Sequence, residues 1–144
     1  MHQPVGYCRY RQSSNQAADF VTRKLEYDNG GVLQALMTEI VANMDASTEV
    51  AKLAKDAADV GLWMSTTASL DDRLAGSVPF TTMCAVAVAE WQLARQARVA
   101  GGAEKAATSA FFDRTIAAEA RGLRSSATAG AELTYGISVS NSRG

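Results

Sequence analysis

The sequence is poor in the residues that build the common kinds of active site. Its 144 residues include one histidine, two cysteines and two prolines, and aromatic residues make up 7%. A metal site needs clustered His, Cys or carboxylate ligands, and a nucleophilic triad needs a base. The single histidine, His2, lies at the N-terminus, and neither Cys8 nor Cys84 has a partner at ligand spacing. We therefore expect no metal site, no catalytic triad and no disulfide.

Charge of one sign is also lacking. The chain has 14 basic and 15 acidic residues, a net charge of −1, so no basic surface is predicted for nucleic acid or for anionic membranes. The start of the chain, Met1–Pro4, does not have the basic and then apolar layout of a signal peptide. The longest nearly uncharged stretch, Leu74–Ala89, is too short and too polar to span a bilayer. We expect a soluble cytoplasmic protein with no membrane partner.

Nucleotide-binding loops are missing as well. Gly30–Gly31 and Gly101–Gly102 match neither the Walker spacing nor Gly-x-Gly-x-x-Gly. We interpret both glycine pairs as places where a helix stops.

Residues that favour helices are plentiful. Apolar residues make up 47% of the chain, much of that alanine, and no segment shows the strict alternation of a strand. Apolar residues recur instead at steps of three and four. The composition and spacing predict an all-α protein with one compact core.

Five helical segments follow from this period and from the caps and turns between them. After a poorly ordered lead-in over residues 1–15, we expect helices starting at Gln16, near Val32, after Asp45–Thr48, at Ser69–Asp72 and at Ala103. The second and third segments could be continuous or separate. Pro79 predicts a kink or a break in the fourth segment. The fifth is expected to run to about Tyr135.

The prediction is an antiparallel bundle of four to five helices over residues 16–137, followed by a frayed tail over residues 138–144. Five aromatic residues at helical spacing are interpreted as core: Trp63, Phe80, Trp91, Phe111 and Phe112.

The charged residues do not suggest a site. Glu90 and Arg95 flank Trp91 at an i,i+5 step, which we interpret as a surface pair. Asp71–Asp72 and Asp56–Asp59 are interpreted as cap and solvent-face charges. From the residues alone we predict no catalytic residue.

Three passages resemble the C-terminal part of the acyl-CoA dehydrogenases. Residues 16–25 resemble the Ala-x-Asp-Leu-x-x-Arg-Lys-Leu helix of the branch with an extra C-terminal extension, and Gly30–Gly31 stands where its Gly-Gly turn would be. Leu74–Phe80 leading into Ala89–Ala97 is similar to the acetyl-CoA dehydrogenase C-terminal-like domain, as in the 3-methylmercaptopropionyl-CoA dehydrogenases. Phe111–Phe112, Leu123 and Ala129–Leu133 carry the third likeness. The likeness as a whole extends over about residues 15–138, and the middle of the chain is carried mostly by its helical pattern.

The resemblance implies a flavoprotein in which FAD takes a hydride from an acyl-CoA while a glutamate removes the α-proton. That glutamate belongs to a Tyr-Glu-Gly-Thr-Asn-Gly-Ile-Gln motif, and its position falls on Tyr10, with Arg9, Arg11 and Gln12 beside it. A tyrosine hydroxyl stays protonated at neutral pH and is not a carboxylate base. Only Gln16 matches the motif, as a cofactor-binding residue close to the flavin.

We therefore expect the C-terminal helical domain of an acyl-CoA dehydrogenase-like flavoprotein, not catalytic by itself and binding no FAD alone. Its partner would be a flavin domain or a second copy of the chain, and acyl-CoA is implied only by the resemblance. The alternative is a standalone helical module for interaction or oligomerisation. A third hypothesis is a helical pocket that still holds an acyl-CoA.

Overall fold

The computed structural model describes residues 15–99 and 101–133, and every regular element within them is helical. The elements are η1 (Phe20–Lys24), α2 (Gly31–Asn43), α3 (Glu49–Thr66), α4 (Leu70–Ala97), α5 (Ala103–Phe112), η2 (Asp113–Ala117), α6 (Ala118–Arg121) and α7 (Arg124–Ala127). Residues 15–19 are α-helical and continue into η1, while α5, η2 and α6 form one uninterrupted run. Counted as runs, the described part has six helices, five of them seven residues or longer. The all-α bundle prediction is confirmed.

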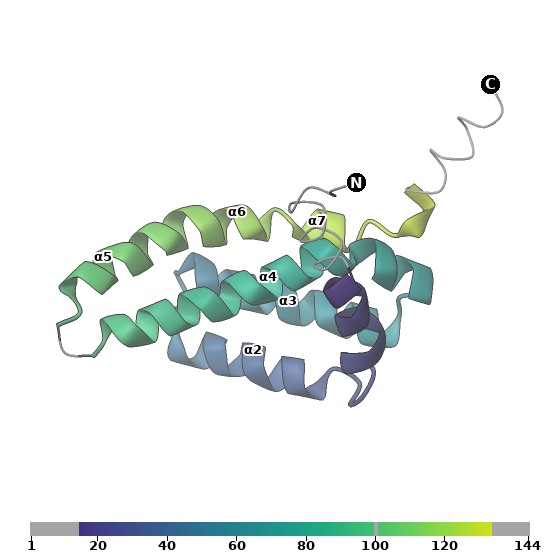
Figure 1. The fold of residues 1–144 in the computed structure, drawn as a ribbon, viewed down its shortest axis with the longest axis horizontal. Helices are drawn as coiled ribbons and strands as arrows, with labels where there is room; N and C mark the ends of the chain where they lie inside the picture. The colour runs from purple at the N-terminus through teal and green to yellow at the C-terminus, as the bar shows by residue number, and fades with distance from the viewer. Residues whose placement is uncertain (1–14, 100, 134–144) are drawn as a thin grey trace, which may run out of the picture.

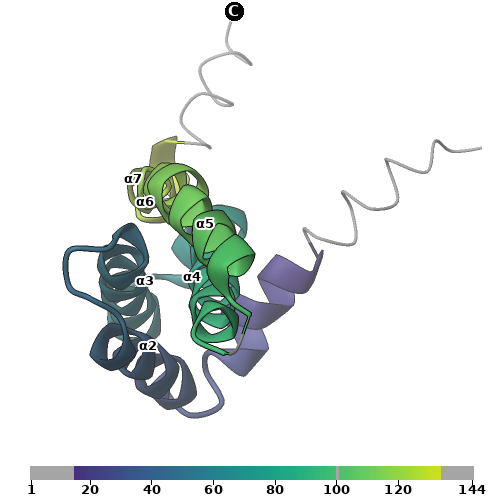
Figure 2. The ribbon, with the colours of Figure 1, turned by 90° about the vertical axis from the view of Figure 1, so that its left-hand side faces the viewer.

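The long helices lie side by side, with α4 at the centre (Figure 1). Seen end-on, α2 and α3 lie on one side of α4, the α5–α6 run lies over it, and the η1 helix covers the remaining side (Figure 2). Neighbours in sequence are neighbours in space, as short loops require of an antiparallel bundle.

Local capping explains where the helices begin. The Thr48 hydroxyl accepts a hydrogen bond from the backbone nitrogen of Ala51 at 3.3 Å, and the Ser69 hydroxyl accepts one from that of Asp72 at 3.1 Å. Gly30 precedes α2 with φ +79°, a conformation that glycine adopts without strain. These three starts agree with the caps and the glycine turn predicted from the sequence.

Helices α2 and α3 are separate, which settles a point that the sequence left open. Met44 follows α2 in an extended conformation, with φ −111° and ψ 151°. Next, the Asp45 carboxylate accepts hydrogen bonds from the hydroxyl and the backbone nitrogen of Ser47, and these bonds lower its pKa. The turn between the helices is therefore held by side-chain hydrogen bonds.

One apolar core joins the helices. Its large buried members come from η1, α2, α3 and α4: Val21, Leu33, Met37, Ile40, Val50, Leu53, Val60, Met64, Phe80, Met83 and Trp91, with Leu25 directly after η1. The rings of Phe20 and Phe80 stack with their centroids 5.7 Å apart, which ties the η1 helix to α4.

The aromatic prediction is confirmed in part. Phe80 and Trp91 are buried, while Trp63 and Phe112 are half-buried. Phe111 is 65% exposed, so its assignment to the core was wrong. The reason is that α5 has no buried residue among its ten and presents Phe111 on its outer side.

Pro79 does not break α4, which continues through it as one helix. The N–H that proline lacks would have bonded the Ala75 carbonyl, and Ala75 lies on the exposed side, where water can replace that bond. Gly76 and Ser77 before the proline and Phe80 after it are all buried. Packing on both sides of Pro79 therefore keeps the helix together, and of the two predicted outcomes a break is excluded.

The last helix is shorter than predicted. The run that begins at Ala103 ends at Arg121, α7 follows as a separate short helix, and Gly130 turns the chain with φ +82°. Gly122 follows Arg121 directly as the C-cap, and glycine is the weakest helix former after proline, so the sequence itself carries a local signal for this stop. Within that run, the π-helical turn η2 begins at Asp113, whose carboxylate accepts a hydrogen bond from α3.

By length and composition alone, one described helix, the 28-residue α4, could cross a membrane. The central helix of a soluble bundle passes the same test. α4 buries nine residues, among them Phe80, Met83 and Trp91, against the other helices. The finding is therefore weak evidence for a membrane span.

Three boundary predictions lie partly or wholly outside the described residues. The helix already includes residue 15, which we had placed in the lead-in, and residues 1–14 are not described. The expected frayed tail, residues 138–144, and Tyr135 lie outside as well.

Candidate functional site

A cleft of about 310 Å³ lies between the C-terminal half of α4, the α5–η2 run and the α2–α3 turn. One part of its wall is small and apolar: Met44, Ala94, Ala97, Ala106 and Ala110. The other part is polar and comprises Thr48, Glu90, Ser109, Asp113 and Arg114. Two carboxylates in unusual surroundings line this cleft: Glu90, which is buried, and Asp113, which bonds the start of another helix.

The Glu90 side chain is the central group of this cleft. Glu90 is only 1% exposed, and the Ser109 hydroxyl donates a hydrogen bond to its Oε1 at 2.8 Å. Its Oε2 is buried and has no hydrogen-bond partner in the described part of the chain. Burial raises the pKa of this carboxyl, the Ser109 bond acts against that, and the nearby Asp113 carboxylate adds to the increase.

The interpretation of Glu90 and Arg95 as a surface pair was wrong. Five residues along an α-helix amount to about 140° of rotation beyond a full turn, so the two side chains leave α4 on different sides. Glu90 shares the buried stripe with Ala87 and Ala94, whereas Arg95 is exposed and its guanidinium lies 5.1 Å from the centre of the Trp91 ring. The spacing of Glu90 from these alanines was the signal in the sequence that could have placed it inside.

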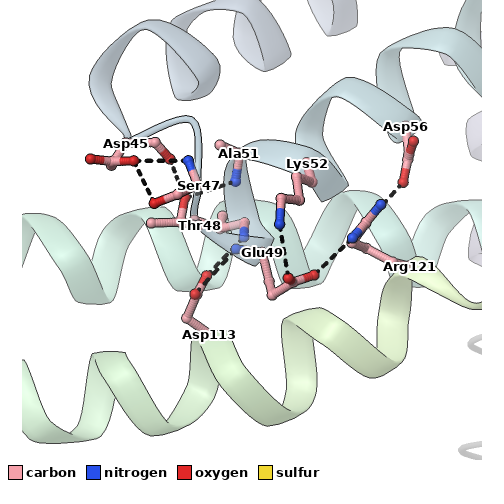
Figure 3. A network of polar contacts seen from close by, with 10 residues as sticks. Asp45, Ser47, Thr48, Glu49, Ala51, Lys52, Asp56, Asp113 and Arg121 are labelled. Carbon is pink, nitrogen blue, oxygen red and sulfur yellow. Dashed lines mark hydrogen bonds and ion pairs between the residues drawn. The ribbon is translucent and has the colours of Figure 1, made fainter.

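Asp113 reaches the cleft from η2 and caps another helix. Its carboxylate accepts hydrogen bonds from the backbone nitrogens of Glu49 and Val50 at 3.2 and 2.8 Å (Figure 3). With the Thr48 hydroxyl on Ala51, three backbone N–H groups at the start of α3 have partners. Sequence reasoning missed Asp113 because the capping residue and the capped helix are far apart in the chain.

An ion-pair cluster continues along α3 from this cap. Arg121 of α6 donates to Glu49 at 2.9 Å and to Asp56 at 3.2 Å, as drawn in Figure 3. Arg124 bonds the other oxygen of Asp56 at 2.6 Å. The hydrogen bonds from Arg121 and Lys52 lower the pKa of the Glu49 carboxyl. The cluster holds the C-terminal helices to α3.

Two aspartates interpreted as cap or solvent-face charges therefore form tertiary contacts. Asp56 is largely covered by its two arginines. Asp72 lies near the cap of α4 as predicted, but its Oδ1 also accepts a hydrogen bond from the backbone nitrogen of Ala131 at 2.8 Å, which lowers its pKa. Both residues anchor the end of the described chain.

A second hollow is almost entirely apolar. It has a volume of about 440 Å³ and lies where η1, α2 and α4 meet. Its lining is Phe20, Leu33, Leu36, Met37, Thr81, Cys84, Ala85, Val88 and Ala89. We call it the apolar groove. Cys84 behaves there as the small buried thiol expected, and burial raises the pKa of that thiol to about 12.

Gln16, the predicted cofactor-binding residue, is exposed in the first turn of the described helix. Its side chain has no hydrogen bond to another described residue. Tyr10, at the position of the family glutamate, and His2 lie outside the described residues. Within residues 15–99 and 101–133, no three His, Cys, Asp or Glu side chains group as metal ligands.

No protein-family model, no curated protein and no solved structure matches this chain.

Proposed function

We propose that this chain is the helical C-terminal domain of an acyl-CoA dehydrogenase-like flavoprotein, to which it contributes packing surface and not the reacting groups. The observation that carries the proposal is the apolar groove, because it lies directly beside the helix whose sequence resembles the family. Phe20 belongs both to that helix and to the lining of the groove.

The resembling helix is an integral part of the bundle. Ala17, Val21 and Leu25 are spaced at four-residue steps, and all three are buried. The Gly30 turn follows, where the family pattern has its Gly-Gly turn. The segment that carries the resemblance is therefore a packed helix followed by a glycine turn, as the family pattern requires.

The apolar surface of the groove is an argument that another domain covers it. Leu36 and Val88 on its walls are half-buried, and the hollow extends past Phe20 and Leu33 toward Val32, which is 73% exposed. Contiguous apolar surface of this kind marks a place of contact with another protein or domain. In the proposed flavoprotein, that contact is with the body that binds FAD and the acyl-CoA.

A purified sample of the chain tests whether it lacks the flavin and the reacting groups. We expect no flavin absorbance and no acyl-CoA-dependent dye reduction, because the glutamate base and the flavin domain are not encoded in it. Flavin absorbance together with turnover would contradict the proposal.

The second candidate is a helical module that associates with itself through the same groove. Sedimentation velocity at micromolar concentration distinguishes the two. A discrete dimer that Leu36→Glu converts to monomer favours self-association, with Ala35→Glu, on the exposed side of α2, as the matched control. A monomer for all three proteins favours a groove that another domain covers.

A further inference from the structure

We propose that the cleft at Glu90 binds a small organic ammonium ion, with the buried Glu90 carboxylate as its counter-charge. This inference goes beyond the proposed function and does not depend on it, because the cleft and the apolar groove share no lining residue.

The first support is an acceptor without a donor. Ser109 satisfies Oε1 of Glu90, but Oε2 is buried and unpartnered in the described part. Leaving a buried carboxyl oxygen without a donor costs free energy, and an ionised one without a counter-charge costs more. An ammonium group supplies both the missing N–H donor and the positive charge.

The second support is the charge around Glu90 on each helix packed against it. From η2, the Asp113 carboxylate adds negative potential to the cleft while its own oxygens are held by the N–H groups of Glu49 and Val50. Arg114, also from η2, lines the cleft, is exposed and forms no ion pair with a described residue. Thr48 and Ser109 are uncharged. The Glu90 and Asp113 carboxylates both line the cleft and interact by charge, so the surroundings of Glu90 oppose an anion and favour a cation.

The third support is the shape of the remaining wall. Ala94, Ala97, Ala106 and Ala110 leave room for a short aliphatic chain and supply no polar group along it. The volume of about 310 Å³ is at the small end of ligand sites. The ligand class is therefore a short aliphatic amine.

The experiment titrates the full chain with n-butylamine at pH 7 and follows the backbone amide resonances of Ser109 and Ala110. Butyramide and butyrate serve as the neutral and anionic probes of similar size. We expect saturable shifts with n-butylamine, weaker binding of butyramide and none of butyrate. Glu90→Gln should weaken the binding of n-butylamine by at least about tenfold, since it removes the counter-charge of the ammonium ion.

The matched control is Glu104→Gln, which removes an exposed carboxylate from the same neighbourhood of the fold, on α5, and should bind n-butylamine as the wild type does. Affinity for n-butylamine should also rise between pH 5 and pH 7, because a proton and the ammonium compete for Glu90 while the amine stays charged. Equal shifts with all three probes, no saturable shift with any, or unchanged binding in Glu90→Gln would overturn the proposal.

Discussion

Asp113 Oδ1 accepts a hydrogen bond from the backbone nitrogen of Val50 at 2.8 Å, across 63 residues of sequence. The N-terminus of α3 is thereby capped by a residue of η2, and the π-helical turn that carries Asp113 lies at the contact between two helices. Such turns often mark places where a helix is adjusted for a specific contact.

Removing this cap should destabilise the bundle. Asp113→Ala leaves the N–H groups of Glu49 and Val50 without partners, and we expect a loss of about 1–2 kcal/mol in the free energy of unfolding. Urea titration followed by circular dichroism measures it. Glu119→Ala, an exposed residue of α6 without an ion pair among the described residues, is the control and should change the free energy by less than about 0.5 kcal/mol. Equal effects of the two variants would contradict the capping role.

The Arg121 cluster should contribute less, and its contribution should depend on salt. Arg121 is 37% exposed at its side chain, so we expect Arg121→Met to cost about 0.5–1 kcal/mol in low salt. In 1 M NaCl the difference from wild type should shrink, because screening weakens exposed ion pairs. Measured by the same urea titration, a cost that does not change with salt would show that packing, and not charge, holds α6 to α3.

Gly76 marks a close approach between α4 and α7. A Cβ at this position would lie 2.1 Å from the carbonyl oxygen of Ala127, so Gly76→Ala requires the backbone to move. The gain in helix propensity is about 1 kcal/mol, which is smaller than the cost of displacing packed backbone. We expect a net loss of more than about 1 kcal/mol by thermal or urea unfolding. Gly122→Ala, where the nearest atom would lie 3.2 Å away, is the control and should be better tolerated.

The pH dependence of Glu90 has a definite sign. Its pKa is higher in the folded than in the unfolded chain, so in the window above the unfolded value, ~4.3, the folded state binds more protons. Stability from this group therefore falls as pH rises. We expect the unfolding free energy of Glu90→Gln minus that of wild type to increase from pH 4 to pH 7.

Taking this difference separates Glu90 from the other carboxyl groups. Asp45, Glu49 and Asp72 have lowered pKa values in the folded state, so their contribution is lost as pH falls, but both proteins contain them. A difference that stays flat or decreases with pH would show that the Glu90 carboxyl is no harder to ionise in the folded state.

The sequence was sufficient to predict the features that depend on interactions between residues close together in the chain. The cap at Ser69, the glycine turn at Gly30 and the apolar period of α3 are each set by residues a few positions apart, and all were predicted. The exposure of Phe111 could not be predicted in the same way, because it depends on which side of α5 packs against α4.

The candidate site was largely missed, for a physical reason. The polar groups of the cleft come from α4, α5, η2 and the α2–α3 turn, and their roles depend on the packing of those elements. Glu90 is of a charged residue type that is usually exposed, but its position along α4 belongs to the buried side of the helix. Only its step of three and four residues from Ala87 and Ala94 favoured burial, and that signal was outweighed by the charge.

Sequencing the genomic DNA immediately upstream of the segment that encodes residues 1–144 tests the proposed kinship most directly. The account predicts that one reading frame, whether in frame or shifted, encodes a Tyr-Glu-Gly-Thr motif and a flavin-binding body before it. DNA that encodes neither in any frame would contradict the assignment to an acyl-CoA dehydrogenase-like flavoprotein and leave the self-associating module as the function to test.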